Sequence, residues 1–245
     1  MFLRRIGANN TKESAVLDSF DITRRWPATH PDRIQLYSMA TPNGVKVSTL
    51  LSECGLPFEA HKVSILEGDQ MTPEFLSLNP NNKIPALIDP DGPDGQPIGL
   101  FESGAIMLYL AEKTGRFLSS DPVERYQTIQ WLMWQMGGAG PMFGQFGFFY
   151  KFAGSSVQDP LPQERFAQES RRLLGVLDRH LAGRSTMVGQ DYSIADIALW
   201  PWINTLHGFY EASERLGLDE FVEVNRWLAA CLARPASQIG LATPA

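Results

Sequence analysis

Between residues 34 and 115, apolar residues fall in short runs separated by breaks rich in Pro and Gly. Such runs are typical of β-strands, whereas the breaks are typical of turns and helix ends. The pattern predicts strands at residues 34–39, 58–63, 84–89 and 98–101. It predicts helices at residues 45–54 and 73–78, and a third helix that Glu102-Ser103-Gly104 opens and Gly115 ends. The order strand, helix, strand, helix, strand, strand, helix indicates a small α/β domain.

From Asp121 onward, apolar residues recur at the three- and four-residue spacing of amphipathic helices. One such stripe consists of Val224, Trp227, Leu228, Cys231 and Leu232. A second stripe runs from Phe166 to Leu181. Ser193 and Asp196 have the spacing of a capping box, in which two side chains satisfy backbone N–H groups at a helix start. An all-α domain is therefore predicted.

The change of pattern predicts two domains that follow an N-terminal arm. The α/β domain is predicted over residues 32–117 and the all-α domain over residues 122–240. Residues 1–31 mix basic with acidic side chains and lack the continuous apolar segment of a secretory signal. We expect them to form an arm that lies over the body of the protein or over a partner subunit.

The composition of the chain argues against several classes of function. The chain has 245 residues, 44% of them hydrophobic, and a formal net charge of -6. Acidic balance argues against binding duplex nucleic acid, which needs a basic surface, and the absence of a run of about 18 apolar residues argues against a membrane span. Cys54 and Cys231 make no Cys-x-x-Cys pair, so a reduced, cytoplasmic setting is expected. The histidines lack metal-ligand spacing, so no metal is expected.

Thr41-Pro42-Asn43-Gly44 lies between the first predicted strand and the first predicted helix. Backbone N–H groups at a helix N-terminus carry partial positive charge and favour anions. The Thr41 hydroxyl and the Asn43 amide can donate hydrogen bonds without becoming covalent nucleophiles, so this segment is suited to holding a thiolate. Simple capping of the helix by Thr41 or Asn43 is the alternative.

Two further segments are suited to a peptide ligand. At Ile84-Pro85 a proline enters a strand, and a cis bond there would leave the Ile84 backbone available to pair with an extended ligand. An ordinary trans proline at a sheet edge is the alternative. Glu102 and Ser103 stand at a predicted helix start, where Ser103 can cap the helix and the pair can bind an amino-acid head group; capping alone is the alternative.

An aromatic cluster follows the flexible segment from Gly137 to Pro141. The glycines and the proline of that segment predict a break or kink in the first long helix. The cluster consists of Phe143, Phe146, Phe148, Phe149, Tyr150 and Phe152. Such a cluster forms either an apolar substrate pocket or part of the core.

The order and spacing of these motifs resemble the glutathione transferase family over nearly the whole of residues 34–238. That resemblance implies a thioredoxin-like N-terminal domain followed by an all-helical domain. Three segments look like those of the bacterial nu class, which is related to the yeast nitrogen-regulator prion protein. These segments are Thr41-Pro42-Asn43-Gly44, Asn81-Asn82-Lys83-Ile84-Pro85-Ala86 and Phe101-Glu102-Ser103-Gly104-Ala105-Ile106.

The resemblance also implies which residues of the first domain bind glutathione. Pro85 is expected to be cis, with Ile84 offering its backbone to the cysteinyl part of the peptide. Glu102 and Ser103 are expected at the γ-glutamyl end. Two more residues are expected near the peptide, namely Gln70 and Lys83.

For the reacting thiol, the resemblance implies that Thr41 and Asn43 occupy the position of the thiol-activating residue. Arg165 in the helical domain matches a position that contacts a second glutathione. Glutathione is thus the expected co-substrate.

The nu class implies a glutathione-dependent disulfide reductase that binds two glutathione molecules, or the disulfide, at one site and uses no catalytic protein cysteine. The family also implies a homodimer. One alternative is conjugation of glutathione to apolar electrophiles, with the aromatic cluster as the pocket for the second substrate. The other alternative is a non-catalytic glutathione-binding regulatory module.

Overall fold

The computed structural model describes residues 17–153 and 156–244, which belong to two compact units. The first unit extends to Leu110 and includes the C-terminal segment from Ile239 onward. The second unit is Ala111–Gln238. Of the predicted arm, residues 1–16 lie outside the described residues. No helix among the described residues is long and apolar enough to cross a bilayer.

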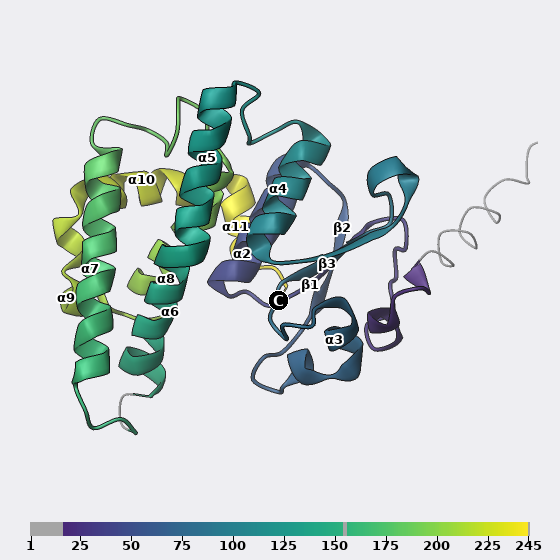
Figure 1. The fold of residues 1–245 in the computed structure, drawn as a ribbon, viewed down its shortest axis with the longest axis horizontal. Coiled ribbons are helices and arrows are strands. Elements are labelled where there is room, and N and C mark those ends of the chain that lie inside the picture. Colours follow the sequence, from purple (N-terminus) through teal and green to yellow (C-terminus); the bar gives the residue numbers. More distant parts are fainter. Residues whose placement is uncertain (1–16, 154–155, 245) are drawn as a thin grey trace, which may run out of the picture. The chain divides into compact units, whose positions relative to one another are not determined.

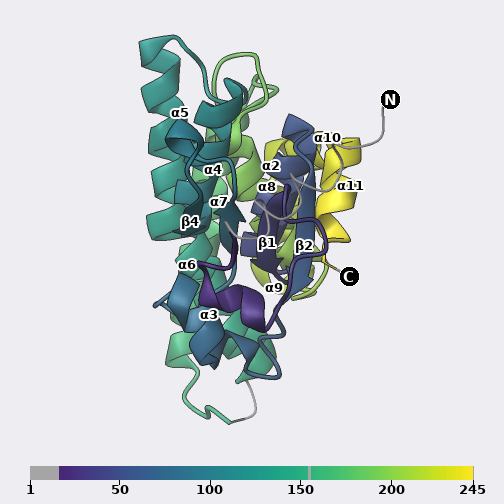
Figure 2. The same cartoon turned by 90° about the vertical axis from the view of Figure 1, so that its right-hand side faces the viewer.

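In the described part of the first unit, four strands form one mixed sheet (Figure 1). They are β1 (Ile34–Ser38), β2 (Phe58–Lys62), β3 (Ala86–Asp89) and β4 (Ile98–Phe101), in the order β2-β1-β3-β4. β1 lies beside β2 (Figure 2) and pairs with it in parallel, whereas β3 is antiparallel to both β1 and β4. The predicted strands are confirmed. β3 begins only after Pro85, because proline has no N–H to donate to the ladder.

Three helices lie where the sequence predicts them, namely α2 (Pro42–Cys54), α3 (Pro73–Leu78) and α4 (Ser103–Thr114), of which α4 ends beyond the boundary between the units. The hydroxyls of Thr41 and Thr72 each accept a hydrogen bond from a backbone N–H of the helix that follows. α2 ends at Gly55, which adopts a φ of 68°. These local signals explain why the helix boundaries could be predicted.

The described part of the arm packs on the sheet. Its short 3₁₀ helix, Asp21–Arg24, carries the fully buried Ile22. Ile22 belongs to one apolar cluster with Tyr37 of β1 and Phe75 of α3. The arm therefore contributes to the core of the first unit.

The described part of the second unit is helical. Its α-helices are α5 (Pro122–Trp134), α6 (Gly140–Gly147), α7 (Leu161–Leu181), α8 (Ile194–His207), α9 (Ser213–Leu216), α10 (Val222–Leu232) and α11 (Pro235–Leu241), the last of which ends in the first unit. The capping box at the start of α8 is confirmed. The buried Asp196 carboxylate also accepts from the Met187 N–H and the Trp227 indole N–H, both at 2.9 Å.

The predicted break or kink between Gly137 and Pro141 takes the form of an interruption of the α-helical ladder, and the chain stays helical through it. A π-helical turn, Gln135–Ala139, connects α5 to α6, and the flanking residues keep right-handed helical angles. The Gly140 N–H donates to the carbonyl of Gln135, five residues earlier. Pro141 has no N–H to donate and directly follows Gly140. It therefore lies where the helix changes from hydrogen bonds five residues apart to hydrogen bonds four residues apart, and it removes no bond from the middle of a regular helix.

Gly44 allows α2 to begin close to the end of β1. A Cβ atom at Gly44 would lie 2.0 Å from the Met39 carbonyl oxygen and 2.4 Å from the Ser38 Oγ. No side chain can be accommodated there unless the backbone shifts. Gly138 in the π-helical turn is different, because a Cβ atom there meets nothing within 4 Å.

We predict that Gly44→Ala lowers the free energy of unfolding by roughly 1–3 kcal/mol or more, because the new methyl group collides with backbone. Gly138→Ala is the matched control and should be neutral, or stabilising by up to about 1 kcal/mol. Denaturant unfolding of the three proteins measures both effects. Equal stability of Gly44→Ala and the parent would contradict the packing described above.

Candidate functional site

The sheet register joins three of the predicted site segments. Ala86, the first residue of β3, pairs with Tyr37 of β1 and with Phe101 of β4. Because β3 is antiparallel to both neighbours, its beginning lies beside their ends. The segments that follow β1, precede β3 and follow β4 therefore meet at one edge of the sheet.

The first of these segments begins α2. Thr41 adopts an extended backbone, and its hydroxyl oxygen accepts from the Gly44 N–H at 3.4 Å. The capping interpretation of Thr41 is thus confirmed. It does not conflict with ligand binding, since a hydroxyl that accepts one hydrogen bond still has its own hydrogen to donate.

Lys46, one turn further along α2, is fully buried. Its ammonium group donates to the Asn43 Oδ1 at 2.8 Å and to the Ser103 Oγ at 3.4 Å. The lysine thereby connects the N-terminal turns of α2 and α4. An ammonium group only donates, so its contact defines the carbonyl end of the Asn43 amide, and the NH₂ end points away from Lys46.

Burial lowers the pKa of Lys46 from its ordinary value near 10.5 to about 7, although the charge of Glu102 opposes this shift. A buried ammonium group with such a pKa is typical of functional sites. Sequence reasoning missed Lys46. The residue falls in a short helix in which residues 44–51 are all buried, and no local pattern distinguishes such a helix from one with a solvated face.

Glu102 and Ser103 are arranged differently from the prediction. α4 begins at Ser103 itself, and the Glu102 carbonyl accepts from the Ile106 N–H at 2.9 Å. The capping position therefore belongs to Glu102, whereas the almost fully buried Ser103 faces Lys46. Glu102 has a φ of 71°, which is unfavourable for a residue with a side chain. Such backbone strain is concentrated at functional sites.

The loop before β3 has the cis Ile84-Pro85 bond that the family resemblance implies. The buried side chain of Asn79 shapes this loop, because its amide donates to the Lys83 carbonyl and its Oδ1 accepts from the Asn81 N–H. The Lys83 side chain is exposed.

Gln70 lies in the 3₁₀ turn Asp69–Met71, in the loop between β2 and α3. Its Nε2 donates to the Ile65 carbonyl at 3.4 Å, while its Oε1 is buried without a hydrogen-bond partner in the described structure. The neighbouring Met71 sulfur accepts from the Asn82 amide at 2.8 Å. This contact connects the Gln70 loop to the loop that carries Lys83 and Ile84.

Arg165 and the aromatic cluster belong to the second unit. Arg165 is an exposed residue of α7. In the cluster, Phe143 and Phe146 are fully buried, whereas Phe148 and Phe152 are exposed. The cluster therefore supplies both core and surface.

Neither cysteine belongs to the N-terminal turn of α2. Cys54 is the last residue of that helix. Cys231 is buried in α10, where desolvation, together with the charge of Asp196, raises the pKa of its thiol. Within residues 17–153 and 156–244, no group of three His, Cys, Asp or Glu side chains is placed to hold a metal ion.

Two family models match the chain. The glutathione S-transferase N-terminal domain matches residues 41–113, and the glutathione S-transferase C-terminal domain matches residues 141–235. The chain belongs to the glutathione transferase family. The predicted fold class, an α/β thioredoxin-like domain followed by an all-α domain, is confirmed.

Relatives within the family are similar over most of their length. The disulfide-bond oxidoreductase YfcG of Escherichia coli is 45% identical over 205 residues, which cover 83% of this chain and 92% of that protein. A glutathione transferase from Pseudomonas putida, solved with one glutathione disulfide per subunit, is 61% identical with a TM-score of 0.92, covering 94% of this chain and 99% of that chain. One from Burkholderia graminis, solved with two glutathione molecules per subunit, is 59% identical with a TM-score of 0.92, covering 93% and 95%.

The lowered pKa of Lys46 predicts how stability depends on pH. Between about pH 7 and 10.5 the unfolded chain holds the lysine proton that the folded protein has lost, so the free energy of unfolding rises with pH in this window. We predict that Lys46→Met removes this rise, which is at most about 1.4 kcal/mol per pH unit. Denaturant unfolding from pH 6 to 9 measures it. Lys62→Met, at an exposed position, controls for the lost charge; equal slopes in Lys46→Met and the parent would contradict the prediction.

Proposed function

We propose that this protein is a glutathione-dependent disulfide-bond oxidoreductase that binds two glutathione molecules, or glutathione disulfide, at one site. One observation carries the proposal. The N-terminus of α2 combines the Thr41 hydroxyl, the Asn43 amide and the buried Lys46 ammonium, and Cys54, the cysteine of this helix, lies at its other end. The name of the relative YfcG, and the ligands in the two solved relatives, support the same activity.

The proposed role of this helix start is to hold a glutathione thiolate. The partial positive charge of the N-terminal N–H groups lowers the pKa of a thiol bound there and raises the fraction that is thiolate at neutral pH. Thr41 donates its hydroxyl hydrogen to the sulfur, and Asn43 donates from its NH₂ end. Lys46 adds positive charge behind Asn43, and a thiolate nearby in turn favours the charged form of the lysine.

The remaining site residues are proposed to hold the peptide. The backbone of Ile84 pairs with the cysteinyl part, and Glu102 and Ser103 bind the γ-glutamyl end. Gln70 and Lys83 contact the rest of the first glutathione. Arg165 contacts the second glutathione from the helical domain.

In the proposed reaction, the first glutathione thiolate attacks one sulfur of a disulfide RSSR. A mixed disulfide between glutathione and R forms, and the other half leaves as a thiolate that takes up a proton. The second glutathione then attacks the glutathione sulfur of the mixed disulfide. The products are glutathione disulfide and two RSH, so two glutathione molecules are oxidised for each disulfide reduced.

The protein's own cysteines take no part in this scheme. Cys54 stands at the opposite end of α2 from Thr41, about 20 Å away at the α-helical rise per residue. Burial of Cys231 disfavours its thiolate, which is the reactive form.

We further propose that the protein is a homodimer and that it works in the reduced environment of the cytoplasm.

We predict that Asn43→Ala lowers the turnover number for a dialkyl disulfide, at saturating glutathione, by roughly 10- to 100-fold, because the thiolate loses a donor and Lys46 loses an acceptor. Thr41→Ser keeps a hydroxyl and should remain close to the parent. The ultraviolet absorbance of bound thiolate against pH measures the thiol pKa directly, which should rise in Asn43→Ala. Parental turnover in Asn43→Ala would remove the central claim.

We also predict that the double variant Cys54→Ser, Cys231→Ser keeps glutathione-dependent disulfide reduction, because glutathione supplies every reacting thiol. Glutathione binding and unfolding measurements control for the integrity of the variant. Loss of turnover in a folded variant that still binds glutathione would assign the reaction to a protein cysteine. Turnover of a haloarene far above that of the disulfide, in the parent protein, would favour conjugation instead.

A further inference from the structure

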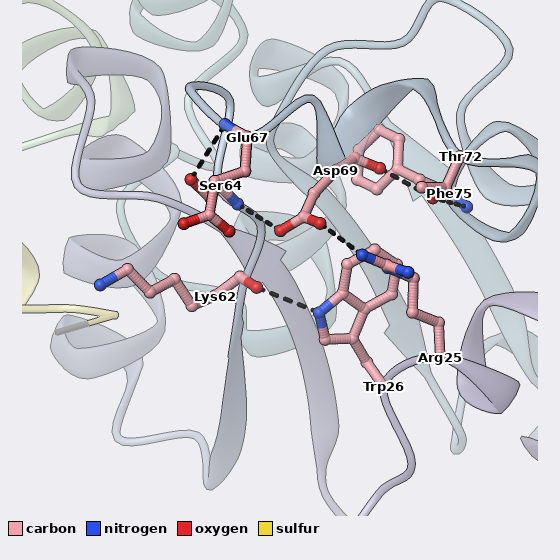
Figure 3. Close-up of polar contacts among 8 residues, drawn as sticks. All are labelled: Arg25, Trp26, Lys62, Ser64, Glu67, Asp69, Thr72 and Phe75. Atoms are coloured by element: carbon pink, nitrogen blue, oxygen red, sulfur yellow. Dashed lines mark hydrogen bonds and ion pairs between the residues drawn. The ribbon is translucent and has the colours of Figure 1, made fainter.

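The loop between β2 and α3 is held by one carboxylate. Asp69 Oδ2 accepts from the Ser64 N–H at 2.9 Å, and Asp69 Oδ1 accepts from the Arg25 guanidinium at 2.6 Å (Figure 3). The Asp69 carbonyl accepts from the Thr72 hydroxyl at 2.7 Å. The beginning and the end of the loop are thus both connected to Asp69.

Two adjacent residues of the N-terminal arm contact this loop and its base. The Trp26 indole N–H donates to the carbonyl of Lys62, the last residue of β2, at 3.0 Å, while Arg25 pairs with Asp69 (Figure 3). The Trp26 ring packs edge-on against Phe75, with ring centroids 6.4 Å apart. The Arg25 guanidinium lies 5.1 Å from the centroid of the Trp26 ring, so the two arm residues support each other.

The pairing of Arg25 with Asp69 is more than an ordinary surface ion pair. Exposed pairs contribute little because water screens them and two long side chains must be ordered. Here the Asp69 side chain is only 14% exposed and receives a second donor from the loop backbone. Burial by itself raises the pKa of Asp69, but the hydrogen bonds from Arg25 and Ser64 outweigh it and lower that pKa.

Gln70 follows Asp69 directly, and the buried Gln70 Oε1 has no partner among the described residues. A buried acceptor without a donor is costly, so a ligand N–H that meets it is favoured. Its direction depends on the backbone of a short 3₁₀ turn that Asp69 begins. We propose that Arg25 and Trp26 of the arm are positioning residues that hold this turn, and with it Gln70, for glutathione. This inference rests on the proposed glutathione-binding role of Gln70.

The experiment measures the Kd for glutathione by calorimetry and the turnover number with a dialkyl disulfide, using the full chain. In Arg25→Ala we expect the Kd to rise about fivefold, which is roughly 1 kcal/mol of binding, while the turnover number at saturating glutathione stays within about twofold of the parent. Arg24→Ala is the matched control, because this neighbouring arginine pairs only with Asp21 of the same turn among the ion pairs of the described residues. Its Kd should not change.

Trp26→Phe keeps an aromatic ring beside Phe75 but removes the indole N–H, so it tests the same proposal if Arg25→Ala fails to fold. We expect a smaller rise in Kd in this variant. Amide exchange at Ser64 reports the loop itself and should become faster in both variants. Faster exchange with a parental Kd would overturn the proposal and leave the arm a purely structural role.

The outcomes separate this proposal from the proposed function. A parent protein that binds glutathione but reduces no disulfide overturns the reaction and still allows the arm to be tested through the Kd. Equal Kd values for the parent and both arm variants overturn the positioning role alone. A parent protein that binds no glutathione overturns both.

Discussion

The pairing of β3 between β1 and β4 is the constraint on which the rest of the first unit depends. Because β3 runs antiparallel to both neighbours, Ala86 lies beside Tyr37 and Phe101, at the ends of the adjacent strands. Loops distant in sequence consequently share one edge of the sheet. The segments at Thr41, Ile84 and Glu102 begin or end at this edge, and the Gln70 loop is connected to it through the contact between Met71 and Asn82.

The buried ammonium group of Lys46 determines which ligands this edge of the sheet favours. Lys46 is fully buried and reaches two helix N-termini, which already carry partial positive charge, through Asn43 and Ser103. Desolvation of a cation beside positive helix ends is unfavourable. The left-handed backbone of Glu102 adds further strain. An anion that binds at this edge relieves part of the free-energy cost of burying the lysine. The arrangement therefore supports the proposed binding of a thiolate and disfavours binding of a cation.

Features with local physical causes could be predicted from the sequence. Thr41 and Thr72 precede proline at a helix start, so both helix beginnings were recognisable, and the capping box at Ser193 was recognisable for the same reason. The segment from Gly137 to Pro141 indicated that the α-helix is interrupted there, but the residue types do not reveal the hydrogen-bond step of the π-helical turn that continues the helix. Ser103 was expected to cap α4 with Glu102 beside it. In the structure Glu102 occupies the capping position, and Ser103 is the first residue of the helix.

The sequence by itself determined the element types, their order and the family, because propensity, capping and motif spacing act over a few residues. Only the tertiary structure decided which distant segments meet, because strand register joins residues that no local pattern relates. The burial of Lys46 depends on neighbours packing around all sides of α2. Likewise, the ion pair between Arg25 and Asp69 could not be predicted from the sequence, because no local pattern relates residues that are 44 positions apart.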